Sequence, residues 1–335
     1  MTKENDIKVS VLMLSYNQEA YIEDAVRSVM HQLTDFDFRL VIGDDCSTDS
    51  TLAICRRLQT EYGANRIEIL PSDRNVGLLA NFKRTFEACS GIYIAICEGD
   101  DYWTDRMKLQ IQADFLDSHP DYSTCVHRVV NYYQDEGTLS KSNGGQKAEN
   151  DIIDLARSNF ISNVSAMFRR GLFGDLPEWI LNVATYDYAI HLMNAEYGKI
   201  HYINRCMAVY RKHRSALWSQ SGAEKQYIMA MTVRKVLMEH FKMRRPDVYA
   251  ILLDAYVNNA VALLCHYART AVSPDKARCI ADEVLAVSPS LTEAELRERI
   301  DAALARTPSL KERAMALLKS TYRKFTRFMP VPKPA

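Results

Sequence analysis

The chain has 335 residues, of which 47% are hydrophobic, so it can fill a large core and exceeds the usual size of one domain. Lysine and arginine number 42, as do aspartate and glutamate, and the zero net charge gives no electrostatic reason to expect a nucleic-acid partner. The eight cysteines are scattered without a Cys-x-x-Cys pair, which favours reduced core residues over zinc or a disulfide framework.

The first part of the chain predicts four strand–loop–helix units in succession. The strands are expected at residues 9–14, 38–42, 67–70 and 92–96. Each run is apolar and β-branched, and each is followed by a polar loop and then by apolar residues at helical spacing. Such units form a mostly parallel sheet with right-handed crossovers, so their loops should converge on one crevice.

Polar and acidic side chains follow all four strands. In chain order they are Ser15, Tyr16, Asn17 and Glu19, then Asp44 and Asp45, then Asn75, and finally Glu98, Gly99, Asp100 and Asp101. The last loop places three carboxylates within four positions, and hard oxygen ligands of this kind suit Mn²⁺ or Mg²⁺ beside a phosphate. The alternative for the acidic residues is helix capping, and Asn75 with Gly77 could equally shape a turn.

In their order along the chain, these motifs resemble family 2 glycosyltransferases with the GT-A fold. The matching runs are Ser15-Tyr16-Asn17, Asp44-Asp45-x-Ser47-Thr48-Asp49-x-Thr51, Asn75-x-Gly77 and Glu98-Gly99-Asp100-Asp101-Tyr102-Trp103. The last run and Val209-Tyr210-Arg211-Lys212-His213 are similar to a bacterial subgroup implicated in cell-surface polysaccharide assembly. The resemblance implies an α/β GT-A domain with a mostly parallel central sheet at residues 1–222, followed by a helical C-terminal region at residues 223–335.

The resemblance also implies a donor site. Asp44 or Asp45 would accept a hydrogen bond from a uracil imide, which a carboxylate can do and which favours a UDP-sugar. Glu98 occupies a position where Asp is commoner, and would meet the ribose hydroxyls or the cation through water. The implied nucleotide-binding residues are Ser15, Tyr16, Asn17, Glu19, Asp44, Asp45, Asn75, Glu98, Gly99 and Arg211, and the implied metal ligands for Mn²⁺ or Mg²⁺ are Asp100 and His213.

A catalytic base is implied in the segment Tyr186-Asp187, where the family usually has Glu-Asp and the second carboxylate takes the proton. With Asp187 as base, one in-line displacement would invert the anomeric configuration; a helix cap is the alternative role. The candidates for acceptor contacts or a closing lid are Asp101, Trp103, Ser165, Arg169 and Trp218.

The C-terminal region shows helical periodicity only. Residues 308–335 combine aromatic and basic side chains in an amphipathic pattern that could lie on an anionic membrane, although a solvated basic face is the alternative. The N-terminus lacks an apolar signal core, and no stretch approaches the roughly 20 apolar residues that span a bilayer. A cytoplasmic enzyme, at most peripheral on the inner face of the plasma membrane, is therefore expected.

The sequence thus predicts a metal-dependent inverting glycosyltransferase that moves a sugar from a nucleotide-sugar donor, a UDP-sugar, to a hydroxyl of a glycan or lipid-linked acceptor. The alternative is a catalytically silent nucleotide-sugar-binding or scaffold subunit, because Glu98 and Tyr186 depart from the family pattern. A phosphate-receiver domain shares the sheet type but leaves the segments of Asp187 and His213 unexplained.

Overall fold

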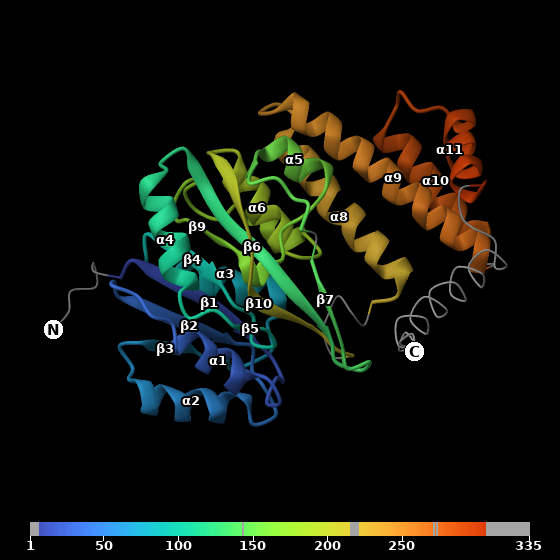
Figure 1. The fold of residues 1–335 in the computed structure, drawn as a ribbon. Helices are drawn as coiled ribbons and strands as arrows, with labels where there is room; N and C mark the ends of the chain where they lie inside the picture. The colour runs from blue at the N-terminus through green and yellow to red at the C-terminus, as the bar shows by residue number, and fades with distance from the viewer. Residues whose placement is uncertain (1–6, 143, 215–220, 271, 273, 306–335) are drawn as a thin grey trace, which may run out of the picture. The chain divides into compact units, whose positions relative to one another are not determined.

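The computed structural model describes residues 7–142, 144–214, 221–270, 272 and 274–305 (Figure 1). The chain divides into two compact units, residues 1–256 and 257–335. The expected acceptor or lid residue Trp218 and the amphipathic segment 308–335 lie outside the described residues. The first unit extends past residue 222 and includes helix α8 (Ala223–Phe241), so the division of function at residue 222 stays a prediction.

The first unit is built on one ten-stranded sheet, in which eight strands follow the order β3-β2-β1-β4-β9-β6-β10-β5, while β7 pairs with β6 and β8 pairs with β10. The strands are β1 (Val9–Ser15), β2 (Phe38–Asp44), β3 (Ile67–Leu70), β4 (Tyr93–Ile96), β5 (Tyr102–Trp103), β6 (Tyr122–Tyr133), β7 (Thr138–Lys141), β8 (Glu149–Asn150), β9 (Met167–Arg169) and β10 (Lys199–Lys212). The four strands predicted from the sequence are confirmed and pair in parallel. Strand β9 runs antiparallel between β4 and β6, so the sheet as a whole is mixed.

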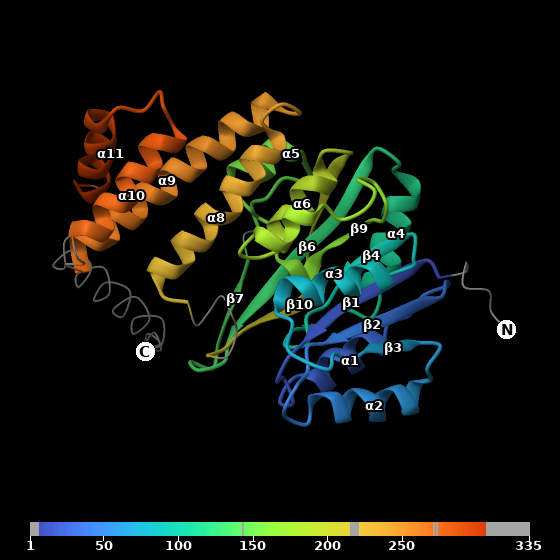
Figure 2. The ribbon, with the colours of Figure 1, turned by 180° about the vertical axis from the view of Figure 1, so that it is seen from behind.

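Helices cover both faces of this sheet. Those of the first half are α1 (Ile22–Met30), α2 (Thr51–Tyr62), α3 (Leu78–Ala88) and α4 (Lys108–Ser118), and those that follow are α5 (Ile152–Arg157), α6 (Asp187–Ala195) and the short 3-10 turns η2 (Asn163–Ser165) and η3 (Glu178–Asn182). Figure 2 shows α3 and α6 in front of the strands. Strands β1 and β4 are buried along their whole length, as expected of strands covered on both faces.

The parallel register places three loops next to one another. Ser15 pairs with Asp44 at the ends of β1 and β2, and Leu12 pairs with Ile96 at the end of β4. The loops that begin after these residues therefore leave the sheet at the same edge, which is where open α/β sheets bind ligands.

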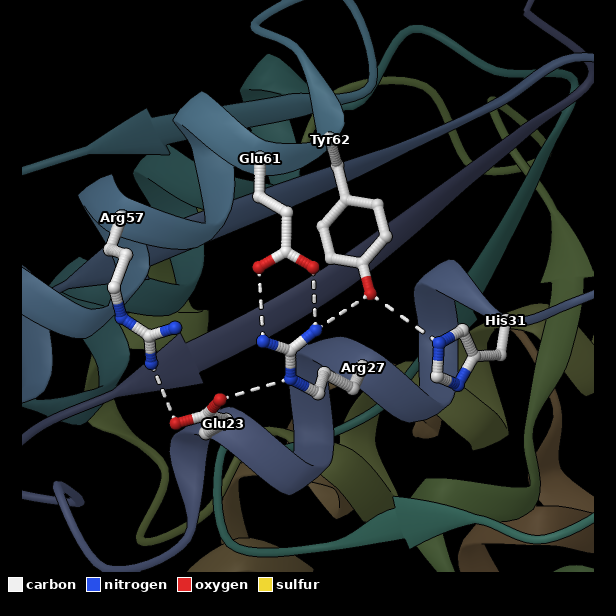
Figure 3. Close-up of polar contacts among 6 residues, drawn as sticks. All are labelled: Glu23, Arg27, His31, Arg57, Glu61 and Tyr62. Atoms are coloured by element: carbon white, nitrogen blue, oxygen red, sulfur yellow. Dashed lines mark hydrogen bonds and ion pairs between the residues drawn. The ribbon is translucent and has the colours of Figure 1, made fainter.

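A polar network joins α1 to α2 on the outside of the sheet (Figure 3). Arg27 donates through Nη1 and Nη2 to the two carboxylate oxygens of Glu61, at 2.7 and 3.0 Å. Glu23 accepts from Arg27 Nε at 2.9 Å and from Arg57 Nη2 at 2.6 Å. Paired, two-pronged contacts of this kind fix the geometry of their partners, so the two helices that follow the first two loops are held in a set relation.

Gly91 lies where the chain enters β4, against the backbone of β1. A Cβ atom at this residue would lie 2.5 Å from the nitrogen of Ser10 and 2.9 Å from the carbonyl carbon of Val9. Gly91→Ala must push the two strands apart, and we expect it to lower the free energy of unfolding by about 2 kcal/mol or more in urea titrations. Gly222→Ala is the control, because a Cβ at Gly222 meets nothing within 4 Å. Equal stability of the two variants would contradict this prediction.

Lys108 is fully buried in α4, and among the described residues it has no carboxylate partner. Its Nζ donates to Gln112 Oε1 at 2.7 Å and lies 4.2 Å from the centre of the Trp103 ring. Burial lowers the pKa of Lys108 to about 7. Because this folded-state pKa lies below the unfolded value, the cost of burying the charge is fully present below pH 7 and disappears as the pH rises towards 10.5.

We therefore expect Lys108→Met to raise the free energy of unfolding at pH 7 by about 2 kcal/mol. The gain over the wild type should shrink between pH 7 and pH 10, as measured by urea unfolding at several pH values. Lys225→Met, which changes an exposed lysine, controls for loss of surface charge. A gain that does not change with pH would show that the charge of Lys108 is not its cause.

Helix α9 (Pro246–Thr270) corrects one expectation from the sequence. It is a 25-residue helix that is long and apolar enough to cross a membrane by length and composition, with half of its apolar window buried. The expectation that no stretch approaches spanning length was wrong, because the only charged residues of α9 are Asp247, Asp254 and Arg269, and an 18-residue window of the helix is apolar on average. A buried core helix passes the same test of length and composition.

The second unit contains the end of α9 with α10 (Pro274–Val287) and α11 (Glu293–Ala305). A threonine and a glutamate cap the start of α11. Thr292 N donates to Glu295 Oε2 at 2.8 Å, and Glu295 N donates to Thr292 Oγ1 at 3.2 Å. This reciprocal pair satisfies backbone groups that the helix start would otherwise leave free.

Candidate active site

The loops after β1 and β2 hold each other through their own polar groups. Asn17 N donates to Ser47 Oγ at 3.0 Å, and Asn17 Oδ1 accepts from Thr48 N at 2.8 Å. Glu19 Oε2 accepts from Ser50 N at 2.9 Å. The side chains of Asn17 and Glu19 are thus used to join the loops, whereas Tyr16 is 46% exposed and open to a ligand.

The backbone of these two loops is unusual at the same place. Asn17 has φ 52° and Cys46 has φ 59°, and they are the non-glycine residues with left-handed backbone among those described. Residues held in this region cost free energy and persist where the surroundings fix them, which is common at ligand sites. The interlocking hydrogen bonds supply that restraint.

Asp44 and Asp45 bind neighbouring loops and do not cap a helix. Asp44 is fully buried, and its Oδ1 accepts from Ser47 Oγ at 2.6 Å and from Ser15 Oγ at 3.2 Å. Asp45 accepts from the backbone nitrogens of Val76 and Gly77, at 2.7 and 2.9 Å. Helix α2 begins after Ser50 without a side-chain cap, so capping does not explain this pair. Each oxygen of Asp45 keeps a second lone pair for a ligand.

The loop after β3 forms a turn at Asn75 and Gly77, which was the alternative to a ligand contact at these residues. Asn75 Oδ1 accepts from Gly77 N at 3.1 Å, and Gly77 has φ 86°. Because Asp45 binds the same nitrogen, the turn lies directly beside the acidic pair. Asn75 therefore shapes the wall of the site, and a direct contact between Asn75 and a nucleotide stays a prediction.

Strand β10 brings its end to the acidic loop. Asp100 Oδ2 and His213 Nε2 are 3.1 Å apart, and His213 is 5% exposed. Asp101 Oδ1 accepts from the backbone nitrogen of Arg211 at 2.8 Å. Burial, with the nearby charge of Asp100, raises the pKa of Asp101 well above its ordinary value. Gly99 N donates to Leu14 O at 3.1 Å, which holds this loop against β1.

The side chain of Arg211 points to α1. Its Nη2 donates to Asp24 Oδ2 at 2.8 Å, and its guanidinium lies 5.2 Å from the ring centre of Tyr21 and 4.7 Å from that of Tyr102. The Tyr21 ring also lies 4.6 Å from the His213 ring. The amphipathic pattern of α1 is ordinary and gives no signal in the sequence that Tyr21 and Asp24 lie at the site. One guanidinium nitrogen of Arg211 is thus held by Asp24, while its buried Nε has no hydrogen-bond partner among the described residues. The predicted contact of Arg211 with a diphosphate stays a prediction.

Glu98 faces the start of α6. Its Oε1 accepts a hydrogen bond from the hydroxyl of Tyr186 and another from Asn163 Nδ2 at 2.8 Å. Burial raises the pKa of Glu98 to about 7, with a further contribution from Asp100, while the hydrogen bonds from Tyr186 and Asn163 oppose the rise. Asn163 and Tyr186 were not predicted as site residues, because no local pattern in the sequence links them to Glu98.

Asp187 is the first residue of α6, and its Oδ1 is buried without a hydrogen bond among the described residues. The helix has no side-chain cap, and the N-cap position is Tyr186, so the capping alternative is not observed. His191 follows one turn later, fully buried, and neither of its ring nitrogens has a hydrogen-bond partner in the part of the chain that the structure describes. Burial lowers the pKa of His191 to about 4, against the opposing effect of the Asp187 charge. The Oδ1 of Asp187 is thus not occupied by a protein donor among the described residues, and a carboxylate oxygen can accept a proton.

Three predicted acceptor residues have other contacts. Arg169 is paired with Tyr93 at the start of β4, opposite the end that carries Glu98, and donates to the carbonyls of Leu116 and Tyr122. Trp103 is 4% exposed and donates from Nε1 to the carbonyl of Val164 at 3.1 Å. The structure does not bring Arg169 to the other candidates, and it places Trp103 in the core.

Ser165 is also turned away from solvent. It is fully buried, and its Oγ donates to the carbonyl of Ser162 at 2.6 Å. The same short turn η2 carries Asn163, which is the member of this segment that reaches Glu98.

Residues 10–176 match the family described as "Glycosyl transferase family 2". The "Uncharacterized protein Rv1520" of Mycobacterium tuberculosis is 36% identical over 220 residues, which are 65% of this chain and 62% of that protein. The chain therefore matches less than two thirds of the length of these mycobacterial relatives. The "Putative teichuronic acid biosynthesis glycosyltransferase TuaG" of Bacillus subtilis is 28% identical over 68% of this chain and 89% of its own length.

Two solved structures share the fold. That of S. aureus TarS 1–349 in complex with UDP-GlcNAc has a TM-score of 0.53 at 19% identity and covers 85% of this chain and 91% of TarS 1–349. That of the mannosyltransferase PcManGT from Pyrobaculum calidifontis, in complex with GDP-Man and Mn²⁺, has a TM-score of 0.54 at 17% identity and covers 89% of this chain and 86% of PcManGT. At this identity the likeness concerns the fold alone.

Proposed function

Residues 10–176 belong to glycosyl transferase family 2 and the fold is GT-A, and on this basis we propose that the chain moves a sugar from a UDP-sugar donor to a hydroxyl of an acceptor. The observation that carries the proposal is the convergence at one sheet edge of Asp45, the pair Asp100 and His213, and the unpaired carboxylate oxygen of Asp187. These groups supply a base-recognition site, a cation site and a general base.

The donor is held by the loops after β1, β2 and β3. Tyr16 is exposed at the site and can cover a planar base, and Asp45 can accept the imide proton of uracil with its remaining lone pairs. TarS with UDP-GlcNAc and PcManGT with GDP-Man support a nucleotide-sugar donor for this fold. Recognition of uracil by a carboxylate is specific against cytosine, because cytosine presents an acceptor at the same edge.

The residues present fit a cation that is shared with the substrate. No cluster of three or more His, Cys, Asp or Glu side chains suited to a metal occurs among the described residues. Asp100 and His213 converge as a pair, and Mg²⁺ or Mn²⁺ in such enzymes takes one or two protein ligands and completes its shell with phosphates and water. When bound, the cation would neutralise charge on the departing diphosphate. The Mn²⁺ in the PcManGT structure supports a divalent cation.

Asp187 accepts the proton of the acceptor hydroxyl as that oxygen attacks the anomeric carbon. The bond from this carbon to the diphosphate breaks at the same time, and the nucleoside diphosphate leaves. Because attack and departure take place on opposite sides of the carbon, a single step of this kind inverts its configuration.

The acceptor belongs to bacterial cell-surface polysaccharide synthesis, as the name of TuaG supports. We place the reaction at the cytoplasmic side of the membrane, where a lipid-linked acceptor would meet the enzyme. Contact through residues 308–335 concerns residues outside those described. Loss of binding to anionic vesicles after removal of residues 308–335 would support it.

Calorimetric titration with UDP, GDP, CDP and dTDP, each with and without Mn²⁺, tests the proposal. We expect UDP to bind in a manganese-dependent manner and CDP to bind at least tenfold more weakly, because cytosine has no imide proton for the carboxylate to accept. Tighter binding of GDP or dTDP than of UDP would contradict a UDP-sugar donor. Asp282→Asn, an exposed change in α10, is the control. Failure of every nucleotide to bind would overturn the transferase proposal and favour a silent scaffold subunit.

A further inference from the structure

The hydroxyl of Tyr186 is part of a closed triangle of polar groups. It donates to Glu98 Oε1 and accepts from Asn163 Nδ2 at 2.9 Å, and the same amide nitrogen donates to Glu98 Oε1 at 2.8 Å. The three residues come from the loop after β4, from η2 and from the start of α6. The triangle therefore joins three segments that are far apart in the sequence.

The ring of Tyr186 is enclosed by packing. Tyr186 is 3% exposed, and its ring stacks on Phe82 of α3 with centres 3.8 Å apart and planes at 9°. Since the next residue is Asp187, the ring and hydroxyl together fix the first turn of α6 relative to the loop that carries Asp100.

Asp187 lacks a comparable restraint of its own. Its Oδ1 makes no hydrogen bond among the described residues, so the place of this carboxylate is set by the backbone to which it is attached. A general base must lie within hydrogen-bond reach of the proton that it takes, and displacements near 1 Å can cost about 100-fold in rate. What holds the start of α6 therefore bears directly on the reaction.

The hydrogen bonds of Glu98 turn its Oε1 towards α6. Two donors already point to its Oε1, and both belong to segments on the side of α6. The residues that face each other across the expected cation site are Asp100 and His213.

The geometry points to Tyr186 and Glu98 as a pair of positioning residues that holds the base Asp187 at a fixed place relative to the donor and cation. This inference rests on the proposed function. It assigns Glu98 a role in the rate of the chemical step and none in binding the metal.

A double-mutant cycle tests the inference with Tyr186→Phe, Glu98→Asp and the double variant. Phenylalanine keeps the stacking on Phe82 and removes the hydroxyl, and aspartate keeps the charge and shortens the reach. Turnover of UDP-glucose and UDP-GlcNAc is followed by UDP release. UDP affinity and the Mn²⁺ concentration that gives half-maximal binding are measured by calorimetry.

We expect each single change to lower kcat by about 10- to 100-fold, with UDP affinity and manganese requirement changed less than about threefold. The kcat of the double variant should be no lower than that of the less active single variant, because both changes remove the same contact. Tyr188→Phe is the matched control on the same helix, since its buried hydroxyl donates to the carbonyls of Leu155 and Ala156 and not to the site. It should keep kcat within about threefold.

If the wild type is active, any of three results would overturn the inference. The first is that the decreases in kcat of the single variants multiply in the double variant. The others are that Glu98→Asp raises the manganese requirement as much as Asp100→Asn does, or that Tyr188→Phe lowers kcat as much as Tyr186→Phe. A wild type that binds no nucleotide and turns over neither sugar would instead overturn the proposed function, and this inference with it.

Discussion

Asp187→Asn should bind UDP and Mn²⁺ as tightly as the wild type and transfer sugar about 100- to 10,000-fold more slowly. Asparagine has nearly the same shape as aspartate but cannot take the acceptor's proton. The change should also leave the free energy of unfolding almost unaltered. Among the described residues Asp187 Oδ1 makes no hydrogen bond, so the variant has none to lose there. Calorimetry, single-turnover kinetics and urea unfolding on one preparation measure the three quantities.

Asp282→Asn again serves as control for the loss of one carboxylate at the surface. Full activity of Asp187→Asn would remove Asp187 as the base. Loss of UDP binding together with activity would show that the residue holds the donor and does not act on the acceptor alone.

Asp100→Asn should lose the manganese-dependent part of UDP binding, at least tenfold in affinity, while the weaker binding without metal stays unchanged. A neutral amide oxygen is a poorer ligand for a hard divalent cation than a carboxylate, and the pair with His213 then offers the cation no protein charge. Titration of UDP at a series of Mn²⁺ concentrations separates the two contributions.

Asp73→Asn, an exposed change after β3, controls for charge in the neighbourhood of the nucleotide loops. Binding of UDP with the wild-type manganese dependence in Asp100→Asn would contradict the assignment of this residue to the cation.

The parallel half of the sheet could be predicted because its strands are continuous apolar runs that end in polar loops. The periodicity that gives β1 to β4 also places Asp45 and Asp100 at one edge. Strands of two or three residues, such as β5, β8 and β9, carry too little periodicity to be predicted, and they depend on pairing with distant partners.

The contacts within the site were harder to predict than its members. Glu98 and Tyr186 each depart from the pattern that the family resemblance suggests. Considered one at a time, these departures favoured the alternative of a catalytically silent subunit. The structure shows that these two side chains touch, 88 positions apart in the sequence. Arg169 shows the opposite case: the motif suggested an acceptor contact, but the residue pairs with Tyr93 at the end of β4 that is far from Glu98.

Strand β10 has a consequence for the order in which the chain can fold during synthesis. It pairs with β6 along most of its length and carries Arg211 and His213 to the acidic loop. A ribosome-bound chain that has reached residue 176 contains all the residues that match the family, but it lacks β10, so the side of β6 that pairs with β10 has no partner. We therefore expect such a nascent chain to form the β1–β4 half first, and to depend on chaperones until residues 199–212 cover an edge that is prone to aggregate.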